Sequence, residues 1–365
     1  MSTYRSPWLD RDRAVAAEAP DTGVAGHYGE PILEQRWLLS GGVVDLSHRA
    51  VLSISGPDRL TWLDSISSQK LLGMLPGSSA ETLILDPNGR IEHSIRLVDD
   101  GESLWLILDG AERETLLPWL QKMKFRAQIE IADRSEEFAV IGTVQAPTFA
   151  LAEANGVPLL WQDSWNSVAS GGYSYAGESS ARNDWSWYEG LVSRDDFSAL
   201  PERHSLRLAG VLAAEALRVE AWRPRFVTEG DERVIPHELD LLRTAVHLNK
   251  GCYRGQETVA KVHNLGHPPR RLTLLHLDGS SSSLPRAGAE IFAVEDGPAI
   301  GTITTAAWHH ELGPVALALI KRKTDPELTL LVATDDARIS ANQEIIVSPD
   351  AGATADIQLK KRKFL

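Results

Sequence analysis

Two glycines flank a cysteine and a tyrosine in residues 250–257, which have the sequence KGCYRGQE. Gly255 comes just before a segment with helical apolar spacing that runs to about Asn264. A helix start presents free N–H groups, and a nearby lysine favours a reactive thiolate. Cys252 is therefore a candidate nucleophile or ligand. The spacing alone favours the alternative, a glycine turn around a buried and inert cysteine.

A second candidate is a carboxylate at the end of an apolar helix. The spacing of residues 206–220 predicts this helix, and Glu220 falls in its last turn. A negative charge at the C-terminal end of a helix interacts unfavourably with the helix dipole, which indicates that the carboxylate has a specific binding or structural role. Glu220 could accept the paired N–H donors of an aminopyrimidine ring. An ion pair with Arg218 or Arg223 explains the carboxylate equally well.

Three further groups of polar residues offer weaker candidates. Glu92 and His93 follow a predicted turn, but neighbours in a strand point to opposite faces, so joint acid–base catalysis is not expected. His263 and His267 are separated by a helix-breaking glycine, and His309–His310 lacks carboxylate or thiol companions. We predict no metal site.

Composition excludes several classes of function. The 365 residues include 37 Lys and Arg against 50 Asp and Glu, a net charge of −13, which argues against tight nonspecific binding of nucleic acid. The single cysteine rules out an internal disulfide, a Cys₄ zinc site and a self-contained iron–sulfur cluster. With only short apolar runs and no signal-like segment, we expect a soluble cytoplasmic protein without a membrane span.

The pattern of elements predicts an α+β fold. Short β-branched runs over 43–47 and 50–55, a helix after Pro57, and a strand meander over 81–108 precede a helix over 111–124 and strands over 128–144. Six short strands between 271 and 347 predict a small barrel. We divide the chain into an irregular N-terminal extension (1–34), an α+β region of two interleaved subdomains (35–268), the barrel (269–348) and a basic tail (349–365).

The segment 250–257 matches the K-G-C-Y-x-G-Q-E signature of the YgfZ family, a branch of the glycine-cleavage T-protein superfamily. Other segments resemble superfamily motifs: 45–48 resembles D-x-S-H, 85–91 resembles L-x-x-x-G-x-I, 217–224 resembles L-R-x-E-A-G-x-P, and 235–238 resembles I-P-x-E. The resemblance covers about residues 40 to 348. It implies antiparallel sheets around a central channel that holds tetrahydrofolate or a one-carbon-substituted folate, with the C-terminal barrel alongside.

The resemblance also implies roles for individual residues. Glu220 would grip the pterin ring, and Cys252 would be the reactive thiol. The other implied cofactor-binding residues are Trp222, Arg223, Lys250, Tyr253, Gly255, Gln256 and Glu257. Members of the family support assembly or repair of iron–sulfur enzymes, including those that modify tRNA, so we expect such enzymes or assembly proteins as partners of a monomeric protein.

Two departures leave alternatives open. Glu92 and His93 stand where the T-protein has an Asp-Asp pair that supplies its catalytic aspartate, which disfavours aminomethyl transfer. Trp222 replaces a glycine of the family pattern and could narrow the channel or stack on the ligand. A folate-dependent aminomethyl- or methyltransferase is the first alternative, and a scaffold that has lost folate is the second.

Overall fold

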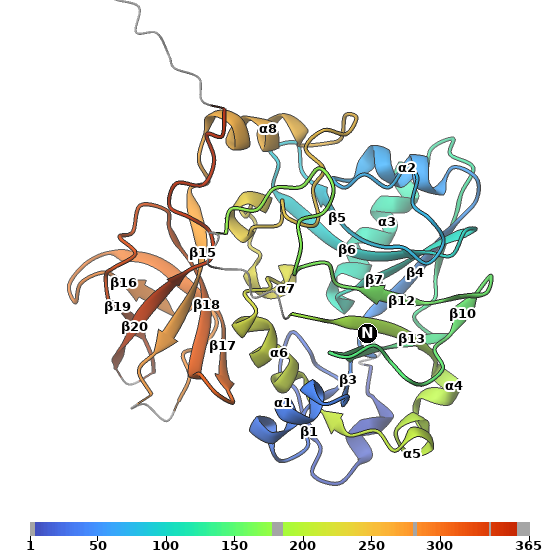
Figure 1. Cartoon of the computed structure of the whole chain (residues 1–365), viewed down its shortest axis with the longest axis horizontal. Helices are drawn as coiled ribbons and strands as arrows, with labels where there is room; N and C mark the ends of the chain where they lie inside the picture. Colours follow the sequence, from blue (N-terminus) through green and yellow to red (C-terminus); the bar gives the residue numbers. More distant parts are fainter. Residues whose placement is uncertain (1–3, 177–184, 280–282, 336, 356–365) are drawn as a thin grey trace, which may run out of the picture.

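The computed structural model describes residues 4–176, 185–279, 283–335 and 337–355 (Figure 1). Two five-stranded sheets and a closed six-stranded barrel make up its framework, and the pairing within the sheets is almost entirely antiparallel. Figure 1 shows the barrel on one side of helix α6 (Val211–Glu220) and the two sheets on the other. The predicted α+β class with antiparallel sheets and a C-terminal barrel is confirmed.

The first sheet contains the predicted meander. Its strand order is β5-β6-β7-β4-β8, with β5 at Ser79–Leu85, β6 at Ile91–Asp99, β7 at Ser103–Leu108, β4 at Ala50–Ser55 and β8 at Glu130–Asp133. Helices α2 (Arg59–Ile66) and α3 (Arg113–Met123) pack their apolar residues into one core with this sheet. Pro118 lies inside α3 rather than at its start.

The second sheet has the order β12-β13-β9-β3-β14. Its strands are β12 (Leu160–Gln162), β13 (Tyr188–Ser193), β9 (Phe138–Thr143), β3 (Val43–Asp45) and β14 (Leu208–Ala209). Strand β14 occupies residues that the sequence predicts to be helical, so the prediction of a helix from 206 is wrong and α6 begins at Val211. The cause is Gly210, whose backbone is extended and lies so close to Gly26 that a side chain there would clash.

The barrel closes in the order β15-β18-β17-β16-β19-β20. Its strands are β15 (Arg270–Leu277), β18 (Gly313–Lys321), β17 (Ala299–His309), β16 (Glu290–Phe292), β19 (Leu330–Ala333) and β20 (Arg338–Ile345). Alternate residues of β15 face opposite sides, as the period of a strand requires. Leu275 and Leu277 fill the barrel, while Leu272 and Leu274 pack in the main core with Leu217 of α6.

The N-terminal segment differs from the irregular extension that the sequence predicts. It contains η1 (Pro7–Asp10), β1 (Val15–Ala16), β2 (Ala25–His27) and the start of α1 (Pro31–Leu39). Trp8 is completely buried, stacks on Phe197 with 4.4 Å between ring centroids, and donates to the Phe197 carbonyl at 3.0 Å. The segment is therefore part of the packed body. The domain boundaries themselves remain predictions.

The remaining elements connect these layers. They are η2 (Gly110–Glu112), β10 (Glu153–Ala154), β11 (Val157–Pro158), α4 (Arg194–Phe197), α5 (Leu200–His204), α7 (Phe226–Glu229), η4 (Pro236–Leu239) and α8 (Gln256–Leu265). No helix in the described ranges is long and apolar enough to cross a membrane. The basic run at 360–363 lies outside the described residues.

Candidate functional site

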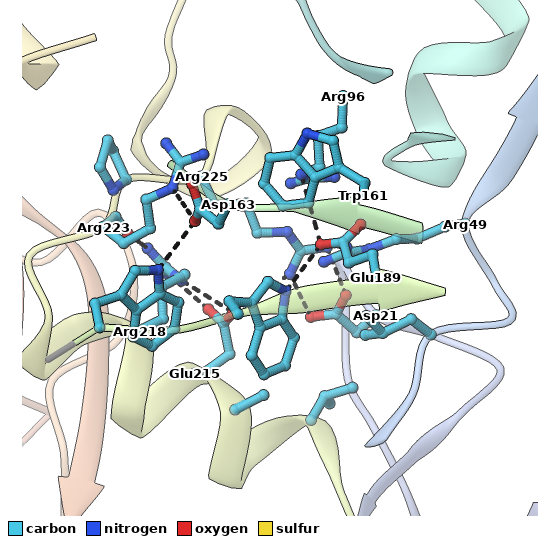
Figure 2. Close-up of a pocket in the computed structure, with 16 residues that line it drawn as sticks. Asp21, Arg49, Arg96, Trp161, Asp163, Glu189, Glu215, Arg218, Arg223 and Arg225 are labelled. Atoms are coloured by element: carbon cyan, nitrogen blue, oxygen red, sulfur yellow. Dashed lines mark hydrogen bonds and ion pairs between the residues drawn. The ribbon is translucent and has the colours of Figure 1, made fainter. Parts of the chain in front are cut away.

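A small cavity lies where α6 faces the two sheets, and its walls are unusually charged (Figure 2). Its volume is about 40 Å³, enough for a few water molecules. Charged side chains and indole rings fill most of the surrounding space. The charged lining residues are Asp21, Arg49, Arg96, Asp163, Glu189, Glu215, Arg218, Arg223 and Arg225.

Arg223 is the predicted cofactor-binding residue that lines this cavity. Its Nε donates to Asp163 Oδ2 at 2.9 Å and its Nη2 donates to Glu81 Oε1 at 2.9 Å. Burial lowers the pKa of Arg223, but the two carboxylates outweigh it, so the pKa lies above its ordinary value. Burial raises the pKa of Asp163 more than Arg223 lowers it.

Arg225 holds a second group of charges together. Both of its terminal nitrogens donate to Asp21, at 2.7 and 2.9 Å, and it also donates to Asp109. The pKa of Asp21 is lowered although its burial opposes this, because His48 donates to it at 2.8 Å and Arg225 lies beside it. Through Asp21, the N-terminal segment supplies one wall of the cavity. No local pattern in the sequence indicated this residue.

The other arginines of the cavity are also paired. Arg218 donates to Glu229 at 2.8 Å and to Glu215 at 2.6 Å, whereas Arg49 forms an ion pair with Glu189. In the folded protein these ion pairs fix the positions of the lining side chains. A polar ligand would have to exchange interactions with such pairs rather than fill an empty space.

Four tryptophans surround the charged network. Trp185 and Trp187 stack, with 5.8 Å between ring centroids and 13° between ring planes. Their Nε1 atoms donate to Asp163 and Glu189, respectively, at 3.0 Å. Trp161 also lines the cavity, and Trp165 lies between the guanidinium groups of Arg223 and Arg243. The sequence showed only that residues 145–205 are rich in tryptophan.

Glu220 lies at the end of α6, half-buried, beside a second and separate cavity of about 60 Å³. This cavity is lined by Leu39, Val144, Trp185, Ser186, Leu217, Glu220 and Ala221. Trp185 thus belongs to both cavities. The structure places Glu220 and Arg223 in two different cavities that share Trp185, and not in one pocket.

The signature loop lies apart from both cavities, and none of residues 250–257 lines either of them. The side chain of Lys250 is only 1% exposed, and its Nζ donates to the carbonyl oxygens of Asp64, Ser67 and Gln69 at 2.5 to 2.8 Å. Burial lowers the pKa of Lys250. With three donors used at the end of α2, Lys250 anchors the loop.

The rest of the loop divides into a buried and an exposed part. Tyr253 is buried, which raises its pKa, and its ring lies 5.5 Å from Lys250 Nζ. Gly255 has φ +83° and lies so close to the β5–β6 hairpin that a Cβ would be 2.6 Å from the Asp86 oxygen. Gln256 Nε2 donates weakly, at 3.4 Å, to the Lys250 carbonyl. The Cys252 thiol and Glu257 are exposed, so the alternative of a buried cysteine is wrong.

Known proteins match this chain over most of its length. An aminomethyltransferase of Bacillus subtilis is 22% identical over 331 residues, covering 85% of this chain and 87% of its own. One from Herpetosiphon aurantiacus is 25% identical over 360 residues, covering 92% and 95%. The crystal structure of glycine cleavage system aminomethyltransferase T from Bartonella henselae superposes with a TM-score of 0.73 at 15% identity, covering 93% and 96%.

The chain is therefore similar to aminomethyltransferases in sequence, and it shares the fold of a glycine cleavage system aminomethyltransferase T over most of its length. No family model matches it, so the finer assignment to the YgfZ branch stays a prediction. In the described residues, no group of three or more His, Cys, Asp and Glu side chains is arranged to hold a metal ion.

Two positions depart from the T-protein pattern. Glu92 forms an ion pair with Arg254 of the signature loop, while His93 lies 3.3 Å from Glu112 on the other side of the strand. The two side chains thus contact different partners, and that they do not act jointly in catalysis stays a prediction. Trp222 has φ +60°, a conformation that favours the glycine of the family pattern, and its indole packs in the main core rather than lining either cavity.

Proposed function

We propose that this protein binds a reduced folate, tetrahydrofolate or a one-carbon-substituted form, at the centre of the fold. The observation that carries the proposal is the set of stacked indoles and buried carboxylates around Trp185. A pterin is a planar aromatic ring with N–H donors, so indole faces and carboxylate oxygens suit it in kind. The arginines of the cavity suit the carboxylates of the folate tail.

The similarity supports the same ligand class, because the sequence relatives are named aminomethyltransferases and the structural neighbour is named an aminomethyltransferase of the glycine cleavage system. Bound folate would supply or accept a one-carbon unit. The residues of this chain would hold it: Glu220 and the indoles would orient the ring, and the buried walls would exclude water. A cavity of about 40 Å³ is smaller than a folate, so side chains must move when it binds.

The role that we propose is that of an accessory protein for the assembly or repair of iron–sulfur proteins, including enzymes that modify tRNA. The exposed Cys252 supports this role, because its thiol is accessible to another protein. A single cysteine cannot hold a cluster, so any cluster would be shared with a partner that contributes the other ligands.

A folate-dependent aminomethyltransferase is the second candidate, and the names of the relatives favour it. The contacts of Glu92 and His93 speak against it. Both side chains are engaged in pairs, Glu92 with Arg254 and His93 with Glu112, at positions where T-proteins carry the Asp-Asp pair. Turnover of an aminomethyl donor by the purified protein would favour the transferase.

Calorimetric titration with tetrahydrofolate and 5-formyl-tetrahydrofolate tests the ligand. We expect Glu220→Ala to weaken binding about 10- to 100-fold, the value of one hydrogen bond to a charged group. The exposed Glu232 gives a matched control, and Glu232→Ala should bind as the wild type does. Unchanged affinity of Glu220→Ala would remove Glu220 from the site, and no binding to the wild type would leave the scaffold without folate.

Complementation of a strain that lacks the protein tests the accessory role. We expect Cys252→Ser to bind folate with nearly unchanged affinity, because the thiol lies outside both cavities. The same variant should fail to restore the activity of iron–sulfur enzymes. Full complementation by Cys252→Ser would show that the thiol is dispensable.

A further inference from the structure

Trp185 is the one described residue that lines both the central cavity and the cavity at Glu220. The two spaces, about 40 and 60 Å³, are each too small for an aromatic ligand. They meet at the indole of Trp185. If that indole moved aside, the space it leaves would join the two cavities into one site. This site would have a carboxylate at each end, Asp163 and Glu220.

Two interactions hold the indole in this position. Its ring stacks on Trp187, and its Nε1 donates to Asp163 Oδ2 at 3.0 Å. A pterin ring is also planar and bicyclic and carries N–H donors. It could therefore make both interactions in place of the indole, stacking on Trp187 and donating to Asp163.

The surroundings allow Trp185 to leave while the rest of the site stays fixed. Asp163 would keep Arg223 Nε at 2.9 Å and the backbone N–H of Trp165 at 3.1 Å, so its buried carboxylate would remain satisfied. Trp187 is wedged against Gly142 of β9, where a Cβ would lie 2.5 Å from its ring, and Glu189 accepts from its Nε1. Trp187 is the fixed platform. Trp185 lies before the start of β13 and takes no part in sheet pairing.

We propose that the indole of Trp185 occupies the place of the pterin ring in the ligand-free protein and is displaced by it. The ring then stacks on Trp187, donates to Asp163 and reaches Glu220 through the joined cavities. Trp185 therefore competes with the ligand for the site and selects among ring systems. A ring binds only if it replaces the stacking on Trp187 and the hydrogen bond to Asp163. This inference rests on the proposed folate function and adds the mode of ring recognition.

The test compares the wild type with Trp185→Ala by calorimetry and stopped-flow mixing with 5-formyl-tetrahydrofolate. Removing the competitor should lower Kd about tenfold, the equivalent of roughly one hydrogen bond, and should speed association. Trp308→Ala, at an exposed tryptophan of the barrel, serves as the control and should change neither quantity. Weaker or unchanged binding by Trp185→Ala would overturn the proposal.

Trp185→Phe guards against a folding defect of the alanine variant. Phenylalanine keeps the stack on Trp187 but lacks the N–H, so it is a weaker competitor and should also bind folate more tightly than the wild type does. Weaker binding would overturn the proposal here as well.

Two fragments separate the failure of this inference from the failure of the proposed function. A tetrahydropterin without the tail should show the gain in Trp185→Ala, whereas p-aminobenzoylglutamate, which lacks the ring, should not. If wild type and both variants bind folate equally, folate binding stands and the displacement of Trp185 fails. If none of the three binds folate, the proposed function fails, and the displacement with it.

Discussion

The carboxylate of Glu92 accepts two hydrogen bonds from the guanidinium of Arg254, at 2.6 Å and 3.3 Å. Glu92 is the second residue of β6, just after the turn of the β5–β6 hairpin, and Arg254 is the variable position of the signature loop. The pair therefore links the hairpin to the loop that presents Cys252. Both side chains are more than a third exposed, at 37% and 36%, so solvent screens their attraction.

A double-mutant cycle with Glu92→Ala and Arg254→Ala should give a coupling energy below about 1 kcal/mol, because an exposed ion pair contributes little. Urea unfolding of the wild type, the two single variants and the double variant measures it. A coupling well above this value would mean that the pair is shielded from water and fixes the loop.

Lys250→Met should be far more damaging. The methionine removes the ammonium that satisfies three carbonyl groups at the end of α2, and buried acceptors without a donor are costly. We expect a loss of about 3 kcal/mol in the free energy of unfolding, measured with urea. Lys261→Met changes an exposed lysine of α8 and should lie within about 0.5 kcal/mol of the wild type. A mild effect at Lys250 would show that water replaces the ammonium.

The elements that the sequence predicted well are those whose pattern is local. The meander and the barrel have short β-branched runs between Gly, Pro and Asp turns, and each run becomes a strand. The start of α6 could not be predicted in this way. The close approach of Gly210 to Gly26 decides where the helix begins. The two residues are too far apart in the sequence for a local pattern to include both.

The site divides along the same line. Arg223 and Glu220 stand in one motif, which predicted both as ligand-binding residues. The structure places them at different cavities that share Trp185, a residue from a segment without periodicity. Asp21 reaches the cavity from a segment that the sequence shows only as polar and rich in Gly and Pro. The family motif led us to expect Lys250 at a cofactor. Its contacts with the carbonyl groups at the end of α2 could not be predicted from the motif, because those residues are distant in the sequence.

The ion pair of Asp21 with Arg225, which attaches the N-terminal segment to the body of the protein, gives a third prediction. Asp21→Asn leaves Arg225 with Asp109 and, at 3.6 Å, with Glu215, and the side chains of Asp21, Asp109 and Arg225 are all nearly buried. Removing one partner of a buried pair is costly, so we expect a loss of about 3 kcal/mol. Urea unfolding gives the loss, and limited proteolysis should show earlier cleavage before residue 30. Asp10→Asn, at an exposed acid paired with Arg5, is the matched control. Equal stability of the two variants would show that the Asp21–Arg225 pair does not hold the N-terminal segment in place.

His237 gives a prediction about pH. It is completely buried on η4, and its Nε2 donates to the Val259 carbonyl oxygen at 3.0 Å. Its pKa is lowered to about 3, mainly by burial. A carbonyl can only accept, so Nε2 carries the proton. In the unfolded chain the imidazole has its ordinary pKa of 6.5. Between pH 3 and pH 6.5 the unfolded chain therefore binds a proton at this histidine that the folded protein does not bind. The contribution to stability is complete above about pH 6.5 and is lost as the pH falls toward 3.

Between pH 6.5 and 5.0 this one group should remove about 2 kcal/mol from the free energy of unfolding. His237→Gln keeps an N–H donor for the Val259 carbonyl but does not titrate, so its stability should fall by about 2 kcal/mol less over the same interval. Urea unfolding at several pH values measures the difference, and His204→Gln on the surface controls for the loss of a histidine. If the wild type and His237→Gln lose stability in parallel, the buried imidazole takes up its proton without unfolding, and the site around η4 must admit water.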